Sequence, residues 1–179
     1  MAASANKEWI VKHGGLALGE HNYDFELKDT FFEGLDYSEI KQGSIKVKLL
    51  LIKRSNLLEL HFVINGLVGV ICDRCADALD LPIEAKNKLI VKIGDNDQGD
   101  TDDDIIIIST KDHSIDLSQY LYEYTMLALP AKREHNNEAD CNQEVIQRLK
   151  TYLIDEEITE DNEQETDPRW DGIKNVNLN

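Results

Sequence analysis

The sequence predicts a mixed α+β fold: an antiparallel sheet, partly barrel-like, in the N-terminal two thirds, followed by two helices and an acidic tail. Two changes of pattern along the chain support this prediction. Apolar and polar residues alternate in several segments before residue 110, as in half-buried strands, and recur with helical spacing afterwards. Strands first and helices later are typical of α+β proteins, whereas α/β proteins alternate the two.

Five segments carry the strand pattern. Residues 23–27 alternate over a short stretch, and residues 44–53 do so over a longer one. Residues 58–71 follow a polar break and are rich in apolar and β-branched residues, so these two longer segments predict an antiparallel hairpin. Residues 79–93 alternate again, and residues 105–108 are consecutive isoleucines that predict a short buried strand.

The dipeptide Asn65-Gly66 lies inside the second half of the predicted hairpin and allows two interpretations. Asn-Gly is a strong signal for a tight turn between two strands. A continuous strand with a glycine kink or bulge at Gly66 fits equally well, because the apolar flanks on both sides are long.

Helical spacing begins after residue 115. Asp116 with Gln119 three residues later is one form of the capping box that starts helices. Pro130 ends this helix, and residues 145–153 predict a second, weaker one. Residues 29–35 predict a turn or a short helix. The apolar face of the first helix consists of four residues spaced by three or four positions: Leu117, Leu121, Tyr124 and Ala128.

Negative charge is concentrated in the second half of the chain. The 179 residues include 35 acids and 19 bases, a net charge of −16. Residues 1–92 have a net charge of −1, and residues 93–179 have −15. A surface this acidic argues against a protein that coats nucleic acid through general electrostatics. The runs 95–104 and 155–167 repel themselves, so we expect solvated loops or docking surfaces for a basic partner.

These patterns predict one domain followed by a tail. The α+β domain extends over residues 1–154, with residues 1–20 partly irregular and an acidic loop at 94–104. Residues 155–179 form an acidic C-terminal tail that ends in a short docking segment. The chain has no apolar stretch long enough to span a membrane and no apolar signal core at its start. Three cysteines cannot make a complete disulfide framework, so we expect a cytoplasmic protein with reduced thiols.

Motifs for enzyme chemistry are absent from the sequence. The chain has no glycine-rich phosphate loop, no Gly-x-Ser-x-Gly elbow and no His-Glu-x-x-His. Its five histidines are scattered, and none is near a nucleophile at a known motif spacing. We therefore expect a protein that is not an enzyme.

Cys72 and Cys75 form a Cys-x-x-Cys pair, the chain's strongest chemical motif. This spacing allows two thiolates to reach one metal ion. His135 and Cys141 complete four ligands if the segment after the first helix folds back, and three thiolates with one imidazole suit Zn²⁺. Two other interpretations stay open: a reduced pair of buried structural cysteines, or a redox pair, although no thioredoxin-like βαβ pattern surrounds the motif.

An ordered set of motifs extends along the chain. The motifs are residues 27–32 (LKDTFF), 43–47 (GSIKV), 69–75 (GVICDRC), 115–117 (IDL), 127–130 (LALP), His135, Cys141, 167–170 (DPRW) and Leu178. This set resembles the YceD family, the large ribosomal RNA subunit accumulation proteins, over about residues 15–175. Some relatives have a second Cys-x-x-Cys-like cluster after the Leu-Pro, where this chain has only His135 and Cys141.

The resemblance implies a non-enzymatic role in the accumulation or processing of large-subunit ribosomal RNA and in ribosome assembly. In many bacteria the family's gene lies beside one for a small, basic ribosomal protein of the large subunit. We therefore expect the partner to be a precursor of large-subunit rRNA, a basic ribosomal protein, or both. The alternative is an acidic, chaperone-like partner of a single basic ribosomal protein that makes no contact with RNA.

The candidate contact residues follow from these alternatives. Lys46 and Lys48 share one strand face and present a narrow basic strip, unless they are ordinary solvated lysines. Trp170 beside Arg169 is the predicted aromatic anchor for a protein partner, unless the tail packs onto its own domain. The full set of predicted RNA contacts is Lys46, Lys48, Lys53, Arg54 and Arg74.

Overall fold

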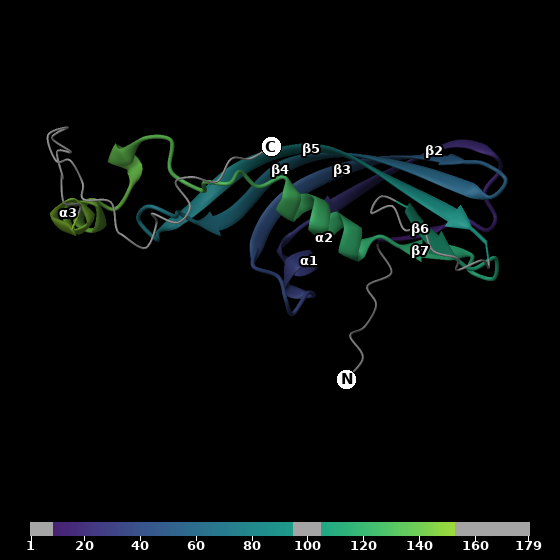
Figure 1. The fold of residues 1–179 in the computed structure, drawn as a ribbon, viewed down its shortest axis with the longest axis horizontal. Helices are drawn as coiled ribbons and strands as arrows, with labels where there is room; N and C mark the ends of the chain where they lie inside the picture. The colour runs from purple at the N-terminus through teal and green to yellow at the C-terminus, as the bar shows by residue number, and fades with distance from the viewer. Residues whose placement is uncertain (1–8, 95–104, 153–179) are drawn as a thin grey trace, which may run out of the picture. The chain divides into compact units, whose positions relative to one another are not determined.

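A five-stranded sheet dominates the computed structural model, which describes residues 9–94 and 105–152 (Figure 1). Its strands, in spatial order, are β2 (Gly19–Leu27), β3 (Gln42–Lys53), β4 (Leu57–Ile71), β5 (Ala78–Ile93) and β6 (Ile105–Ile108). β3, β4 and β5 are the longest strands and pair over nearly their whole lengths. The predicted strands and the β3–β4 hairpin are therefore confirmed. Residues 105–108 were expected to be buried, but β6 is a partly exposed edge strand.

The chain divides into two units, Met1–Asn142 and Gln143–Asn179. The first unit contains the sheet, the short helix α1 (Asp29–Glu33), α2 (Ser118–Leu127) and the 3₁₀ turn η2 (Glu138–Asp140). The second unit contains α3 (Gln143–Tyr152). Within the described residues, every helix is too short or too polar to cross a lipid bilayer. The acidic run 95–104 and the predicted tail 155–179 lie outside the described residues.

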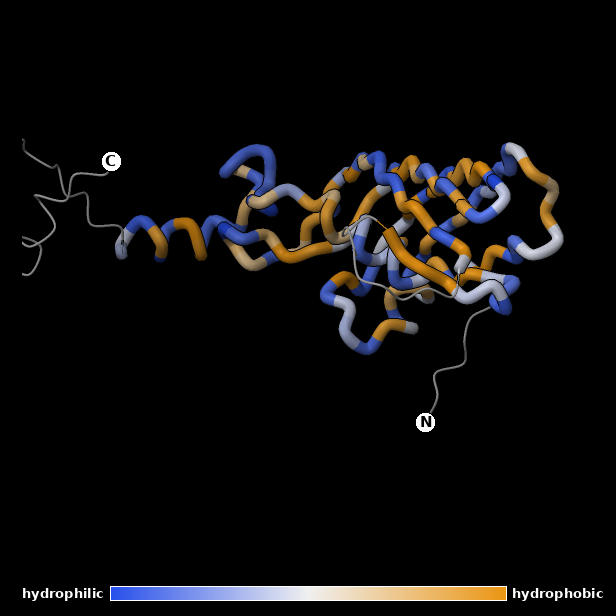
Figure 2. Tube along the Cα trace, turned by 45° about the vertical axis from the view of Figure 1, so that its right-hand side comes forward, coloured by the Kyte–Doolittle hydropathy of each residue, from blue (hydrophilic) through white to orange (hydrophobic). Residues whose placement is uncertain are grey.

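One face of the sheet forms the core, because alternate residues along most of β3 and β4 are buried. Hydrophobic and hydrophilic residues alternate along the strands in Figure 2. The covering side chains come from α1, α2 and the first strand β1 (Ile10–Lys12). Phe62 of β4 contacts Tyr124 of α2, with ring centroids 5.2 Å apart. The fully buried members of this core include Phe31, Phe32, Ile45, Leu49, Leu51, Leu58, Leu60, Phe62, Ile64 and Leu117.

The barrel-like closure predicted for the sheet is wrong. Among the described residues, β2 and β6 are the two edge strands, and no strand pairing joins them. The sheet is also not wholly antiparallel, because β6 pairs with β5 in parallel. Periodicity within a segment reveals a strand but not the direction in which it returns, so the isoleucine run could not indicate its orientation.

A second, two-stranded sheet was not predicted. β1 pairs antiparallel with β7 (Ser114–Asp116), and Val11 lies opposite Ile115. β1 falls within residues 1–20, which the sequence indicated as partly irregular. Strands of three residues are too short to show an alternating pattern, so their pairing depends on burial of Val11 and Ile115 against the core.

The start of α2 differs from the predicted capping box. Asp116 precedes the helix as the end of β7 and accepts a hydrogen bond from the backbone N–H of Ser118, 2.9 Å away. Gln119 does not reach back; its amide donates to Glu123 one turn later, at 2.8 Å. Asp116 thus satisfies one of the exposed donors at the helix start from a position outside the helix.

Gly66 lies in an uninterrupted β4, which decides between the two interpretations of Asn65-Gly66. Gly66 is opposite Ile45 of β3 and Ile83 of β5, with the register unbroken on both sides. A Cβ added at Gly66 would lie 2.3 Å from the carbonyl oxygen of Ser44 and 2.6 Å from the Cα of Ile45. Glycine is required here because the backbone of β3 occupies the space of a side chain.

Replacing Gly66 with alanine should therefore destabilise the protein by about 1–3 kcal/mol, since backbone rather than a flexible side chain must move. Denaturant unfolding of the purified chain measures this difference. Gly15→Ala is the matched control, because no atom lies within 4 Å of the added Cβ. Equal unfolding midpoints for the two variants would contradict the proposed close approach.

Candidate metal centre

The turn between β4 and β5 positions Cys72 and Cys75. The backbone N–H of Cys72 donates to the carbonyl of Asp77 at 2.8 Å, and the N–H of Ala76 donates to the carbonyl of Cys72 at 2.9 Å. Ala76 has a φ of 62°, a left-handed conformation that is uncommon for residues with a side chain. These bonds curl the turn so that both thiol groups are buried.

The segment after α2 is held against this turn by a reciprocal contact between Asp73 and Arg133. The N–H of Asp73 donates to the carbonyl of Arg133 at 2.7 Å, and the N–H of Arg133 donates to Oδ2 of Asp73 at 2.8 Å. The Arg133 guanidinium also lies 3.4 Å from Oδ1 of Asp73. This contact brings His135 and, beyond the η2 turn, Cys141 to the cysteine pair.

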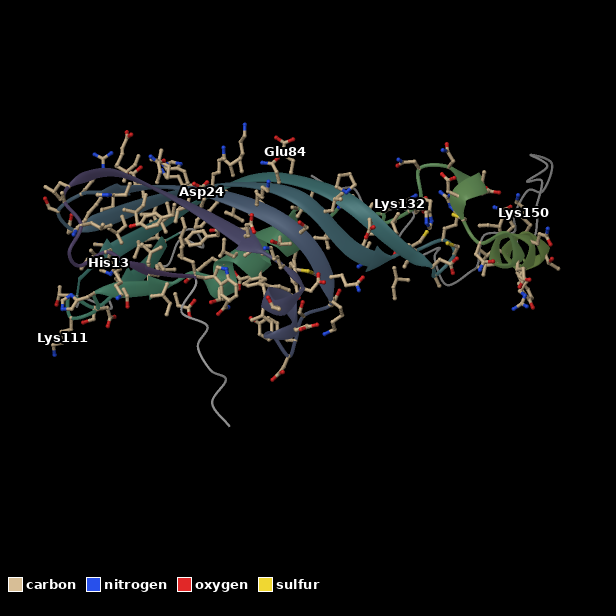
Figure 3. The ribbon with its side chains drawn as sticks, turned by 180° about the vertical axis from the view of Figure 1, so that it is seen from behind. His13, Asp24, Glu84, Lys111, Lys132 and Lys150 are labelled. Carbon is tan, nitrogen blue, oxygen red and sulfur yellow. The ribbon has the colours of Figure 1, made fainter. Side chains whose placement is uncertain are left out.

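Cys72, Cys75, His135 and Cys141 form a cluster whose ligand atoms all lie within 4.8 Å of one another. The sulfur atoms gather near Lys132 in Figure 3. Nδ1 of His135 lies 3.7 Å from Sγ of Cys75 and 3.6 Å from Sγ of Cys141. Tetrahedral zinc, with bonds of about 2.3 Å to sulfur and 2.0 Å to nitrogen, separates its ligand atoms by about 3.5–3.8 Å. The cluster therefore fits a metal such as zinc.

The environment favours a thiolate at Cys72. Burial raises the pKa of Cys72, but backbone hydrogen bonds from Cys75, His135 and Arg74 lower it to about 6. The pKa of Cys141 is raised, first by burial and then by the neighbouring Cys75 thiol. None of the three cysteines is in a disulfide. At neutral pH the cluster thus has an ionised thiolate ready to bind a cation, since metals bind the thiolate form.

Arg74 lies between the two cysteines in sequence and contacts the cluster directly. Its Nη1 lies 3.7 Å from Sγ of Cys141, within reach of an N–H···S hydrogen bond. Its Nη2 forms an ion pair with Glu134, the residue before His135. Three thiolates, one neutral imidazole and Zn²⁺ carry one net negative charge, and the Arg74 cation offsets it. Outer contacts of this kind orient and stabilise metal ligands.

The other predicted RNA contacts lie elsewhere, on or beyond β3. Lys46 and Lys48 share the exposed face of β3, with Glu26 and Asp24 of β2 directly opposite them. Asp24 and Glu84 lie on this same face in Figure 3. The basic strip is therefore bordered by acidic side chains.

Lys53 and Arg54 make contacts within the chain. The ammonium group of Lys53 donates to the carbonyls of His13 and Leu16, at 2.7 and 2.9 Å. Arg54 pairs with Glu59 at 2.8 Å. Both residues lie at the far end of the β3–β4 hairpin from Arg74, separated by the fifteen residues of β4. The structure does not bring the five predicted contacts together.

Sequence reasoning found the four cluster residues but missed the contacts that bring them together. Asp73, Arg133 and Glu134 supply the contacts described above, and the sequence showed only that Asp73 follows Cys72 and that Glu134 precedes His135. The predicted partner contacts Arg169 and Trp170 lie outside the described residues.

Comparison with known proteins identifies the family. Residues 60–177 match the family described as large ribosomal RNA subunit accumulation protein YceD, a range that includes all four cluster residues and α3. Comparisons with curated proteins and with solved structures give no match. Since the matched range spans most of the chain and includes the motifs from residue 69 to residue 170, the chain belongs to the YceD family.

Proposed function

We propose that this protein is a non-enzymatic factor that promotes accumulation of large-subunit ribosomal RNA by binding an rRNA precursor, a basic ribosomal protein, or both during ribosome assembly. Membership of the YceD family carries this proposal, because the family is described by that role.

We further propose that Cys72, Cys75, His135 and Cys141 hold one zinc ion with a structural role. Four protein ligands fill a tetrahedral shell, whereas catalytic zinc keeps a position open for water or substrate. When bound, the ion would supply a fixed link between the β4–β5 turn and the segment after α2. This argument supports a binding protein rather than a metal-dependent hydrolase.

A second candidate function is an acidic, chaperone-like partner of one basic ribosomal protein without RNA contact. The arrangement of cations favours it. Lys46 and Lys48 lie opposite Glu26 and Asp24, which weakens their attraction for phosphate. The net charge of −16 attracts a basic protein and repels nucleic acid.

The zinc proposal predicts about one zinc ion per chain in protein purified without chelator. His135→Ala should lose this zinc, because three thiolates then share the site with water. Elemental analysis together with native mass spectrometry measures the stoichiometry. His113→Ala is the matched control, since His113 is exposed and outside the cluster. Equal zinc content in the two variants would contradict the ligand assignment.

Arg74→Met should weaken zinc binding about 10-fold or more, because the N–H···S contact and the compensating cation are lost. Competition with a chromophoric chelator measures the affinity, and Arg74→Lys should recover part of it. Arg54→Met is the control, since Arg54 pairs with Glu59 at the opposite end of the β3–β4 hairpin. Unchanged zinc affinity in Arg74→Met would leave RNA contact as the better role for this arginine.

Depletion of the protein should lower the ratio of large- to small-subunit rRNA in its cells, and the wild-type chain should restore that ratio. Quantitative RNA analysis of ribosomal gradients checks this, and the protein should migrate with large-subunit precursors. An unchanged ratio on depletion would overturn the proposed function.

Filter binding to large-subunit rRNA fragments at two salt concentrations separates the two candidate functions. Direct RNA contact predicts an affinity that falls as salt increases, and that falls further in Lys46→Gln/Lys48→Gln. The control is Lys12→Gln/Lys111→Gln, which removes the same number of positive charges from exposed positions outside the predicted contacts. Absence of RNA binding, together with capture of a basic ribosomal protein, would establish the second candidate.

A further inference from the structure

A groove lies beside the metal centre, within the unit Met1–Asn142. Its volume is about 580 Å³, and three stretches of chain form its walls. These stretches are the start of β3 with the residues before it, the end of the β4–β5 hairpin, and the end of α2 with the residues after it. Cys72, Asp73 and Arg133 belong to its lining, so the contact that assembles the metal centre also shapes the groove.

The floor of the groove is apolar. Val70, Met126 and Leu129 line it and are partly buried hydrophobic residues that pack against the core. Leu79 lines it too and is half-buried. Ile71, at the end of β4, also lines the groove and is 64% exposed. Apolar surface that is exposed, concave and continuous with the core is typical of a site that binds another molecule.

The charged side chains of the groove have a small acidic excess. Its lining contains three acids, Glu39, Asp73 and Asp80, and two bases, Lys41 and Arg133. Arg133 forms an ion pair with Asp73, so Glu39 and Asp80 remain against the single base Lys41. The surroundings of the apolar floor therefore carry one net negative charge, which attracts cations and repels phosphate.

We propose that this groove binds a basic, amphipathic segment of a partner polypeptide. The apolar side of that segment would cover Ile71 and the floor, and its lysine or arginine side chains would lie against wall acids such as Glu39 and Asp80. A partner of this kind satisfies both features of the groove, whereas RNA offers phosphate to an acidic wall. The proposal goes beyond the role in rRNA accumulation, because it assigns a surface and the chemistry that the surface recognises.

Fluorescence anisotropy with synthetic probes tests the proposal on the full-length chain. The probe is a labelled peptide of about 18 residues, or five helical turns, made of leucine and lysine with the leucines on one helical face. A peptide of the same composition with scrambled order should bind at least about five-fold more weakly, since its leucines cannot share one face. The leucine–glutamate counterpart should not bind.

Two matched pairs of variants locate the binding surface. Ile71→Ser should weaken probe binding about five-fold or more, because apolar contact area is lost without a change of charge. Leu18→Ser should leave it unchanged, since Leu18 is 66% exposed but outside the groove. Asp80→Asn should weaken binding more than Asp24→Asn, which removes the same charge from exposed β2. The second pair keeps the test valid if Ile71→Ser unfolds.

Four results would overturn the proposal. Equal binding of ordered and scrambled peptides would indicate nonspecific attraction to net charge. Equal peptide affinities within both variant pairs would exclude the groove as the binding surface. If an rRNA oligonucleotide binds more tightly than the peptide and Ile71→Ser abolishes its binding, the groove would be assigned to RNA. If the chain self-associates and Ile71→Ser abolishes self-association, the groove would be assigned to a second copy of the chain. The assay uses purified protein, so these results are independent of rRNA levels in cells.

Discussion

The exchange of hydrogen bonds between Asp73 and Arg133 links the two parts of the chain on which the candidate site depends. Cys72 and Cys75 are local to one turn, but His135 and Cys141 follow α2 and have no pairing with the large sheet of their own. Two backbone-directed bonds and an ion pair hold the later segment in place. Each such bond contributes only about 1 kcal/mol, so a metal ion that joins the same two segments would reinforce a modest contact.

The length and register of β4 explain why the predicted RNA-contact residues lie in different surroundings. Its fifteen residues separate the cysteine turn from the opposite end of the hairpin, where Lys53 and Arg54 make intramolecular contacts. Along the exposed face, the register places Lys46 and Lys48 opposite acids of β2. Charge is thereby balanced on the sheet, and the groove beside the metal centre has an acidic excess.

Family membership and the local geometry complement each other. The family indicates a role with large-subunit rRNA but no contact residues. The geometry indicates a closed four-ligand centre and a neighbouring apolar groove, but neither reveals the cellular process. Arg74 connects the family resemblance with the local geometry. It belongs to the Cys-x-Arg-Cys motif of the resemblance, and its guanidinium contacts the thiol of Cys141. An arginine that the sequence offered as an RNA contact is thus occupied within the protein.

The sequence by itself determined the five strands of the large sheet, the helices α2 and α3 and the four candidate ligands, because alternation, helical spacing and Cys-x-x-Cys are properties of short segments. It left open whether Gly66 forms a turn, and it did not indicate the β1–β7 pairing or the parallel direction of β6. Only the tertiary structure decided these features, along with the place of Arg133 beside Asp73. Each depends on residues distant in sequence that meet after the core has formed, and local periodicity contains no information about which distant segments meet.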